Sequence, residues 1–264
     1  MQLLREVLKP LFRYFNDADV REYFRVKGKC KRIKDGAAVT FHVKGFQIET
    51  NHASSFLHLY EEIVLHKCFD IDLGHDAPVI ICAGANIGLE IFLLSKKYPK
   101  GMIFAYEADP HFAELFRKNL KRNNVANVEL IEAAVWTGNG KIPFTSDGAL
   151  GGKAGVGGTE VRSVDFLNEL NRFVTIDLLI MDIEGAEFSV LEHSRDELSR
   201  VKNMFVEWHG RAGQPQQLPE FLDILATCGF RYRIDNKLPV SPFKDRLTEN
   251  GFDAMTGIYA HRPE

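Results

Sequence analysis

The chain has 264 residues, of which 45% are hydrophobic and 26% charged, and its formal net charge is −3. These values are typical of a globular protein with one large domain, and they exclude a strongly basic nucleic-acid binder. The four cysteines are scattered and form no Cys-x-x-Cys pair, which argues against a disulfide framework. No apolar run reaches the ~18 residues of a membrane span. No secretory leader is evident either, so we expect a cytoplasmic protein.

Residues 1–16 have the pattern of a short amphipathic helix that Pro10 interrupts. Its apolar stripe consists of Leu4, Val7, Leu8, Leu11 and Phe15. Two interpretations fit this stripe: weak contact with a membrane surface, and packing against the protein itself or a partner chain. The short length favours packing.

A hairpin and a second helix complete an N-terminal extension that we expect to span residues 1–75. Residues 37–50 read as two short strands around a turn at Lys44-Gly45. Residues 54–69 have helical periodicity, with Ser54 or Ser55 as the predicted N-cap. The basic residues between Lys27 and Lys34 fit either contact with an anionic partner or a solvated face of the hairpin, and the solvated face is favoured.

Residues 76–264, the predicted main domain, are organised around one strand and the glycine turn that follows it. Val79–Ala83 is an apolar run typical of a buried parallel strand, and Gly84-x-Asn86-x-Gly88 then opens a helix. A strand, a glycine turn and a helix N-terminus form a nucleotide-type binding site. The turn lacks the three glycines of a dinucleotide site and the lysine of a phosphate loop. S-adenosylmethionine, which has no pyrophosphate, fits such a turn, and a tight turn without a ligand fits it equally well.

The next predicted strand, Met102–Glu107, ends in a carboxylate about 20 residues beyond the glycine turn, where an acidic residue binds the ribose of a nucleotide. Glu107 therefore favours the ligand-binding interpretation over a solvated strand end.

Strand and helix patterns then alternate, which predicts an α/β fold with a doubly wound, mostly parallel sheet. We expect helices near 86–98 and 110–124, and strands at Val128–Glu132, Ile176–Met181 and Asn203–Trp208. The glycine-rich residues 147–158 read as a flexible loop, and their place between two strands favours a lid over the site above a plain surface loop.

Three sequence elements together resemble the FkbM-type methyltransferase family. They are Gly84-Ala85-Asn86-Ile87-Gly88, then Tyr106-Glu107-Ala108-Asp109-Pro110, then Asp182-Ile183-Glu184-Gly185-Ala186-Glu187 after its strand. The resemblance covers roughly residues 55–262 and implies a seven-stranded, Rossmann-like class I fold. It adds a helix at 216–228 and strands near 230–235 and 256–261, the last one antiparallel.

The resemblance also implies S-adenosylmethionine as cofactor and an O-methyltransferase activity on a hydroxyl of a sugar, glycan or other small molecule. The implied cofactor-binding residues are Gly84, Ala85, Asn86, Gly88, Glu107, Ala108, Ala134 and Asp182. This chain departs from the family at one point: Cys82 stands where an acidic residue is usual, two positions before the first glycine. We predict that Cys82 is packed in the sheet and is not catalytic, because no cation lies beside it in the sequence to lower its pKa.

The catalytic candidates follow the fourth and fifth strands. Asp182 and Glu184 alternate with Ile183, so both carboxylates can face one crevice, and His209 follows the neighbouring strand. A hydroxyl loses its proton during methyl transfer, and His209 is the first choice of base because its ordinary pKa lies near 7. Asp182 or Glu184 is the alternative base or orients His209. A divalent metal held by Asp182, Glu184, Glu207 and His209 ranks below a metal-free base, so we predict no metal.

Two other functions compete with the methyltransferase. The first is a non-catalytic binding or scaffold protein on a methyltransferase fold, and the only sequence feature that supports it is Cys82. A nicotinamide-dependent oxidoreductase is disfavoured by the missing glycine. The sequence does not indicate the oligomeric state or the identity of the methyl acceptor.

Overall fold

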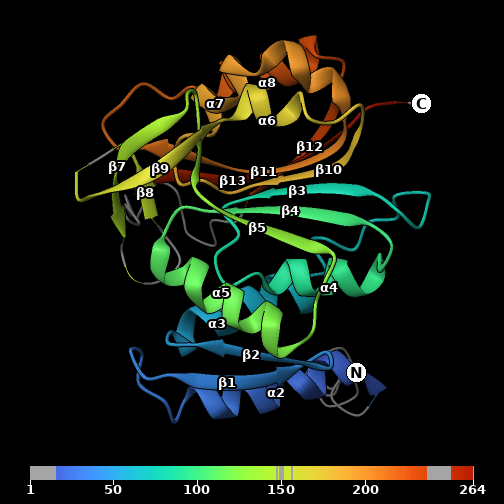
Figure 1. Cartoon of the computed structure of the whole chain (residues 1–264), viewed down its shortest axis with the longest axis vertical. Helices are drawn as coiled ribbons and strands as arrows, with labels where there is room; N and C mark the ends of the chain where they lie inside the picture. The colour runs from blue at the N-terminus through green and yellow to red at the C-terminus, as the bar shows by residue number, and fades with distance from the viewer. Residues whose placement is uncertain (1–15, 147, 149–151, 156, 237–250, 264) are drawn as a thin grey trace, which may run out of the picture.

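The computed structural model describes residues 16–146, 148, 152–155, 157–236 and 251–263. The main sheet lies in the middle with helices on both faces, and an N-terminal hairpin forms a further layer beyond one of them (Figure 1). The helix predicted at 1–16 falls outside these ranges except for Asn16. No helix among the described residues is long and apolar enough to cross a membrane.

The main sheet has seven strands in the order β12-β13-β11-β10-β3-β4-β5. They are β3 (Val79–Ala83), β4 (Met102–Glu107), β5 (Val128–Glu132), β10 (Ile176–Met181), β11 (Val201–Arg211), β12 (Arg231–Asn236) and β13 (Phe252–His261). The five strands from β5 to β11 are parallel, and β13 pairs antiparallel with both β11 and β12. The predicted seven-stranded α/β sheet with an antiparallel last strand is therefore confirmed.

Side chains of the central strands alternate between two hydrophobic clusters, one on each face of the sheet. Ile80 and Cys82 belong to the cluster that also contains residues of α4 (Leu89–Lys97) and α5 (Pro110–Arg122). Ile81 and Ala83 belong to the other cluster. That cluster is covered by α6 (Phe166–Leu170), α7 (Glu187–His193) and α8 (Leu218–Thr227), with a 3₁₀ helix at Arg195–Arg200 (Figure 1). Because both faces are buried, the central strands are mostly apolar, and Asp177 of β10 is a buried exception.

The N-terminal segment consists of α2 (Ala18–Cys30), β1 (Val39–Val43), β2 (Phe46–Thr50), α3 (Ala53–Tyr60) and a π-helix at Glu61–Leu65. The predicted hairpin and its turn are confirmed, since β1 and β2 pair antiparallel around Lys44-Gly45. The Ser54 or Ser55 cap was wrong: the N-cap of α3 is His52, and the hydroxyl of Ser54 contacts Asp35 instead.

Two further features of this segment differ from expectation. Lys27 and Lys29, assigned to a hairpin face, lie in the last turn of α2. The cluster that contains α2, the hairpin and α3 also contains α4 and α5, so the hydrophobic core runs across the expected boundary at residue 75. The division into 1–75 and 76–264 stays a prediction.

A second, four-stranded sheet was not predicted. Its strands are β6 (Ala134–Trp136), β7 (Gly140–Ser146), β8 (Gly152–Ala154) and β9 (Thr159–Asp165), in the order β6-β9-β7-β8. The strand β8 lies inside the segment 147–158 that was predicted to be a flexible loop. Gly152 serves packing there, because a Cβ at this position would lie 2.2 Å from the ring of Phe144.

Candidate active site

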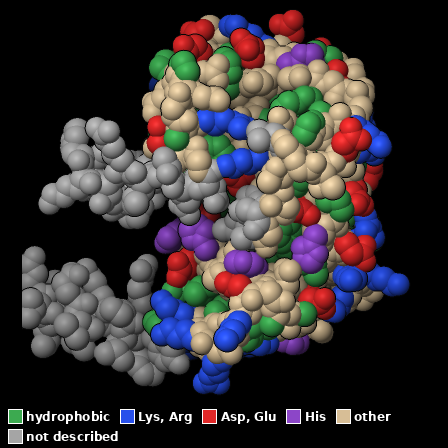
Figure 2. Space-filling model, turned by 90° about the vertical axis from the view of Figure 1, so that its left-hand side faces the viewer, with side chains coloured by type: hydrophobic (Ala, Val, Ile, Leu, Met, Phe, Trp, Pro, Cys, Tyr) green, Lys and Arg blue, Asp and Glu red, His purple; other side chains and the backbone are tan. Residues whose placement is uncertain are grey.

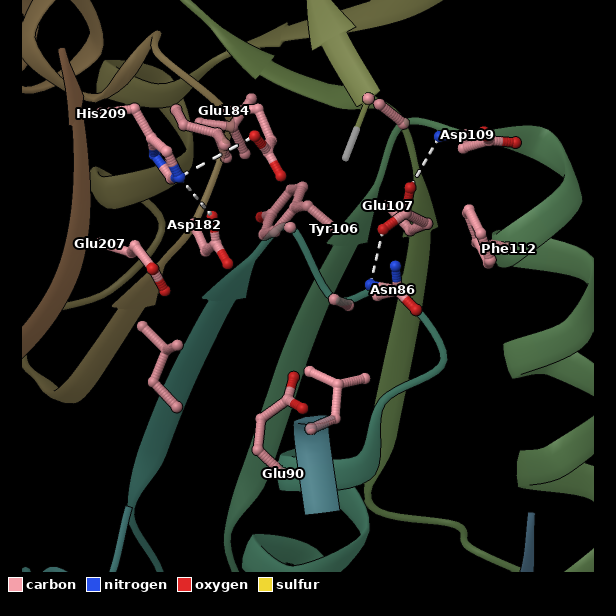
Figure 3. Close-up of a pocket in the computed structure, with 18 of the residues that line it drawn as sticks. Asn86, Glu90, Tyr106, Glu107, Asp109, Phe112, Asp182, Glu184, Glu207 and His209 are labelled. Atoms are coloured by element: carbon pink, nitrogen blue, oxygen red, sulfur yellow. Dashed lines mark hydrogen bonds and ion pairs between the residues drawn. The ribbon is translucent and has the colours of Figure 1, made fainter. Parts of the chain in front are cut away.

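A cavity of about 610 Å³ lies at the carboxyl ends of β3, β4, β10 and β11. The glycine turn and the ends of β4 and β10 form its floor (Figure 3). Side chains of α3, the π-helix, the second sheet and β13 also line it. Its volume is within the range of pockets for drug-sized ligands, roughly 300–1,000 Å³. The cavity thus has the position expected for a ligand site in an open α/β sheet.

The glycine turn at the end of β3 requires glycine for a steric reason. Gly84 has φ +85°, and a Cβ there would lie 1.7 Å from the carbonyl oxygen of Asp182. The amides of Gly84 and Ala85 both donate to the carbonyl of Tyr106, at 3.0 and 2.9 Å. The turn therefore packs directly against β4 and the end of β10, and Gly84, Ala85 and Asn86 line the cavity.

Gly88, which the resemblance assigned to the cofactor, does not line the cavity. It is the N-cap of α4 with φ +77°, and a Cβ would lie 2.2 Å from the ring of Phe116. The structure therefore gives Gly88 a packing role, and its contact with the cofactor stays a prediction.

Glu107 lies at the end of β4, with its carboxylate facing the cavity (Figure 3). Its two oxygens accept the amides of Asn86 at 2.6 Å and Asp109 at 2.7 Å. Burial raises the pKa of Glu107 to about 7, and these amides pull the pKa in the opposite direction. Each oxygen has a second lone pair, so Glu107 can still accept hydrogen bonds from a ligand.

His209, at the end of β11, lies against three carboxylates. Its Nδ1 is 3.0 Å from Oε1 of Glu187, and its Nε2 is 3.9 Å from Asp182 and 3.8 Å from Glu184. The predicted catalytic residues are therefore together in the cavity (Figure 3). The partner that sequence reasoning missed is Glu187, although the Asp-x-Glu-Gly-x-Glu motif contains it.

Glu187 fixes both the motif and the imidazole. Its Oε1 accepts the amide of Ile183 at 3.2 Å and the amide of Gly185 at 3.0 Å, which closes the turn after β10. Both Glu187 and His209 are buried. The contact at Nδ1 orients the imidazole so that Nε2 faces Asp182 and Glu184.

The protonation state of this group differs from the expectation of a neutral histidine. Burial lowers the pKa of His209, but Glu187, Asp182 and Glu184 outweigh it and raise the pKa to about 10. Burial and the nearby Glu207 raise the pKa of Asp182 well above its usual range. In the ligand-free protein at neutral pH, His209 therefore carries a proton and cannot accept another one.

Asp182 presents its two carboxylate oxygens differently. Oδ1 is shielded and has no hydrogen-bond partner among the described residues, while the side chain as a whole is 41% exposed. The second oxygen is thus the one that a ligand can reach. Asp182, Glu187 and His209 also have ligand atoms within 4.8 Å of one another, close enough to hold a metal ion.

Sequence reasoning also missed Glu90, which lines the cavity from the first turn of α4. Only 8% of Glu90 is exposed, and the thiol of Cys82 donates to its Oε1 at 3.4 Å. Burial raises the pKa of Glu90 to about 7. Cys82 is 1% exposed, which confirms that it is packed in the sheet, and burial raises the pKa of its thiol. None of the four cysteines forms a disulfide bond in the part of the chain that the structure describes.

The charge of the cavity has one sign. Seven carboxylate residues line it: Glu62, Glu90, Glu107, Asp109, Asp182, Glu184 and Glu207. The described lining residues include two histidines but no lysine and no arginine. On one face of the molecule, histidine and acidic side chains are interspersed across the middle (Figure 2). Such a cavity favours a cationic ligand over an anionic one.

The N-terminal segment supplies the wall opposite the sheet. Ser54, Ser55 and His58 come from α3, and Glu62 comes from the π-helix. π-helical turns are rare in proteins, and those that occur are often found at functional sites.

The strand order and the cavity at the carboxyl ends of the parallel strands define a class I methyltransferase fold. Within this class, the chain belongs to the FkbM methyltransferase family, because the family described as "Methyltransferase FkbM domain" matches residues 83–232. The resemblance seen in the sequence is thereby confirmed.

Two curated proteins are similar to this chain over more than half of its length. Methyltransferase sdnD of Sordaria araneosa is 28% identical over 199 residues, which cover 60% of this chain and 77% of that protein. The 2-O-methyltransferase NoeI of Sinorhizobium fredii is 27% identical over 174 residues, which cover 56% and 71%.

Solved structures are similar to this chain at low sequence identity. TYW2 of M. jannaschii, solved in complex with AdoMet, has a TM-score of 0.45 and 13% identity, with 87% of this chain and 88% of that chain covered. Trm5b of Pyrococcus abyssi has a TM-score of 0.48 and 15% identity, with coverages of 86% and 56%.

Proposed function

We propose that this protein is an S-adenosylmethionine-dependent O-methyltransferase that acts on a hydroxyl of a sugar, glycan or other small molecule. The observation that carries the proposal is the acidic cavity at the end of β3 and β4. It combines a sterically required glycine turn, a strand-end carboxylate and no lining lysine or arginine among the described residues.

The residues of the cavity fit this cofactor. Glu107 would accept hydrogen bonds from the ribose hydroxyls, and Asn86 and Ala108 lie beside it in the lining. Ala134 is 4% exposed and offers a small, flat surface for the adenine. Gly84, Ala85 and Asp182 lie nearer the end of β10, where the methionine part would bind.

When bound, S-adenosylmethionine supplies a methyl group on a positively charged sulfur. The chain must then hold the acceptor oxygen in line with that methyl group, and positioning of this kind supplies roughly 7–11 kcal/mol. Acidic side chains around the site favour the cationic cofactor over its neutral product.

We assign to Asp182 the role of the base that removes the proton from the acceptor hydroxyl. Its raised pKa makes it a stronger base than an ordinary aspartate, and its side chain is partly exposed to the cavity. His209 was the first choice from the sequence. Because its pKa is raised in the ligand-free protein, His209 has another role, as a cation. Glu187 orients the imidazolium, which stabilises the ionised carboxylate of Asp182.

The acceptor class rests on two features. One relative is named a 2-O-methyltransferase, which supports a hydroxyl acceptor. Ser54, Ser55 and His58 on the wall opposite the sheet offer hydrogen-bonding groups to a polyhydroxylated molecule. We also propose that the acceptor is not a nucleic acid. We further propose that the protein is cytoplasmic.

Transfer of a radiolabelled methyl group to a panel of glycan and small-molecule hydroxyl acceptors tests the activity. We expect label in at least one acceptor and loss of that label in Asp182→Asn. If added EDTA abolishes transfer and Mg²⁺ or Mn²⁺ restores it, a metal at Asp182, Glu187 and His209 replaces the metal-free base. Cofactor binding without transfer to any acceptor supports the alternative of a non-catalytic binding or scaffold protein.

A further inference from the structure

Glu90 is a buried carboxylate in a position that packing alone does not explain. It lies in the first turn of α4, where its neighbours Leu89, Ile91 and Phe92 are buried in the core. Its side chain lines the cavity and lies below the group of Asp182 and His209 in the view of Figure 3. A buried carboxylate destabilises the fold unless a cation or several donors offset its desolvation.

The described surroundings of Glu90 offer little such compensation. Its carboxylate accepts hydrogen bonds from the backbone amide of Glu90 itself and from the thiol of Cys82 at 3.4 Å, and a thiol is a weak donor. The described residues that line the cavity include no lysine and no arginine. Glu90 also borders a smaller cavity with Lys44, Lys67 and Lys97, but Lys44 and Lys97 pair with Asp19 and Asp70. Burial disfavours the ionised form of Glu90 and raises its pKa. A ligand with a positive charge would supply the missing partner.

The contact with Cys82 places the carboxylate of Glu90 close to the glycine turn. Cys82 lies two residues before Gly84, where the resemblance to the family predicts an acidic residue, and it is itself buried. The thiol of Cys82 contacts Glu90, and the charges of Glu90, Asp182 and Glu107 all act on it. The carboxylate of Glu90 therefore lies next to position 82, where this chain has a cysteine instead of the expected acidic residue.

We propose that Glu90 binds the α-ammonium group of the cofactor's methionine part, in place of the acidic residue that Cys82 replaces. This inference rests on the proposed function, because it names the residue that recognises one end of the proposed cofactor. A carboxylate that gains an ammonium partner forms a charge-assisted hydrogen bond.

Binding measurements on three ligands test the assignment. S-adenosylmethionine and S-adenosylhomocysteine contain the ammonium group, whereas 5′-methylthioadenosine has the same adenosine and a thioether but no amino acid part. We expect Glu90→Gln to weaken the first two ligands by about 10–10²-fold. Affinity for 5′-methylthioadenosine should change by less than about threefold, because that ligand makes no contact with Glu90.

Two further variants make the result specific. Glu114→Gln removes an exposed carboxylate of α5 that does not line the cavity, so it controls for the loss of one negative charge, and we expect all three affinities to be retained. Cys82→Asp combined with Glu90→Gln returns an acid to the neighbouring position. That double variant should recover part of the lost affinity for S-adenosylmethionine and none for 5′-methylthioadenosine. Thermal unfolding of each variant verifies that it is folded.

The outcomes separate this inference from the proposed function. If the wild type binds the ligands and Glu90→Gln binds all three as well as the wild type, or weakens all three equally, Glu90 does not bind the ammonium group. If the wild type binds none of the ligands, the proposed cofactor is wrong and the role of Glu90 falls with it.

Discussion

Replacement of Glu107 by alanine is the perturbation with the most definite expected effect. The carboxylate is 7% exposed, and its two oxygens accept amides at 2.6 and 2.7 Å. Two lost hydrogen bonds from the ribose to a charged acceptor correspond to roughly 1.5–3 kcal/mol each. We therefore expect affinity for S-adenosylmethionine to fall by about 10² to 10⁴-fold.

The same substitution also affects the protein without its cofactor. The amides of Asn86 and Asp109 lose their acceptor, and water in the cavity replaces it only in part. We expect a loss of about 1–2 kcal/mol in the free energy of unfolding. Each kcal/mol lowers the melting temperature of a chain of this size by about 2–4 °C, so the variant should stay folded at 25 °C.

Glu132→Ala is a matched control. Glu132 ends the neighbouring strand β5, opposite Glu107 in the register, but it is exposed, pairs with Arg117 at 2.6 Å and does not line the cavity. Isothermal titration should show a large loss of affinity in Glu107→Ala and near-normal affinity in Glu132→Ala. Equal affinities in the wild type and folded Glu107→Ala would remove Glu107 from the ribose site.

Three further predictions concern the base, the buried charge and the turn. Asp182→Asn should lower kcat by about 10²–10⁴-fold at saturating cofactor. Activity of the wild type should fall as pH drops through the pKa of Asp182, because the protonated carboxyl cannot accept the proton of the acceptor. If instead only His209→Ala removes the acidic limb of the pH profile, His209 is the base. Because the pKa of Glu90 rises from 4.5 to about 7 on folding, stability of the cofactor-free protein should fall as pH rises from about 4.5 to 7. Glu90→Gln should remove this part of the decline and be more stable than the wild type at pH 8, by up to about 3 kcal/mol, but not at pH 4.5, as denaturant titrations at both pH values will show. Gly84→Ala should prevent stable folding, since its Cβ would meet the carbonyl of Asp182, whereas Gly138→Ala, with open space around it, should melt like the wild type.

The main sheet was predictable because its strands are buried on both faces. Val79–Ala83 is a continuous apolar run and Ile176–Met181 is apolar except for Asp177, so both the strands and the edge that carries the site followed from the pattern. Glu107, Asp182 and His209 were found for the same reason, since each lies at or just beyond the end of such a strand.

The second sheet was not predictable from local pattern. Its strands are short, and β8 consists of Gly152, Lys153 and Ala154, a composition typical of a flexible loop. What makes it a strand is its pairing with β7 and the space that Gly152 leaves for Phe144. Such long-range contacts leave no period in the sequence.

The electrostatics of the site also depended on the fold. Glu90 stands within an apolar helical run, where a single charged residue normally marks the solvent side. The protonation of His209 depends on three carboxylates that come from α7 and from the turn after β10. Sequence spacing brought two of them near His209 but gave no sign that Glu187 holds its Nδ1.

Isothermal titration of the wild-type protein tests the central claim most directly. We predict that S-adenosylmethionine and S-adenosylhomocysteine each bind saturably with one equivalent per chain, and that NAD produces no binding heat. An absence of binding by both sulfur ligands, or saturable binding of NAD, would contradict the account of this cavity as the cofactor site of a methyltransferase.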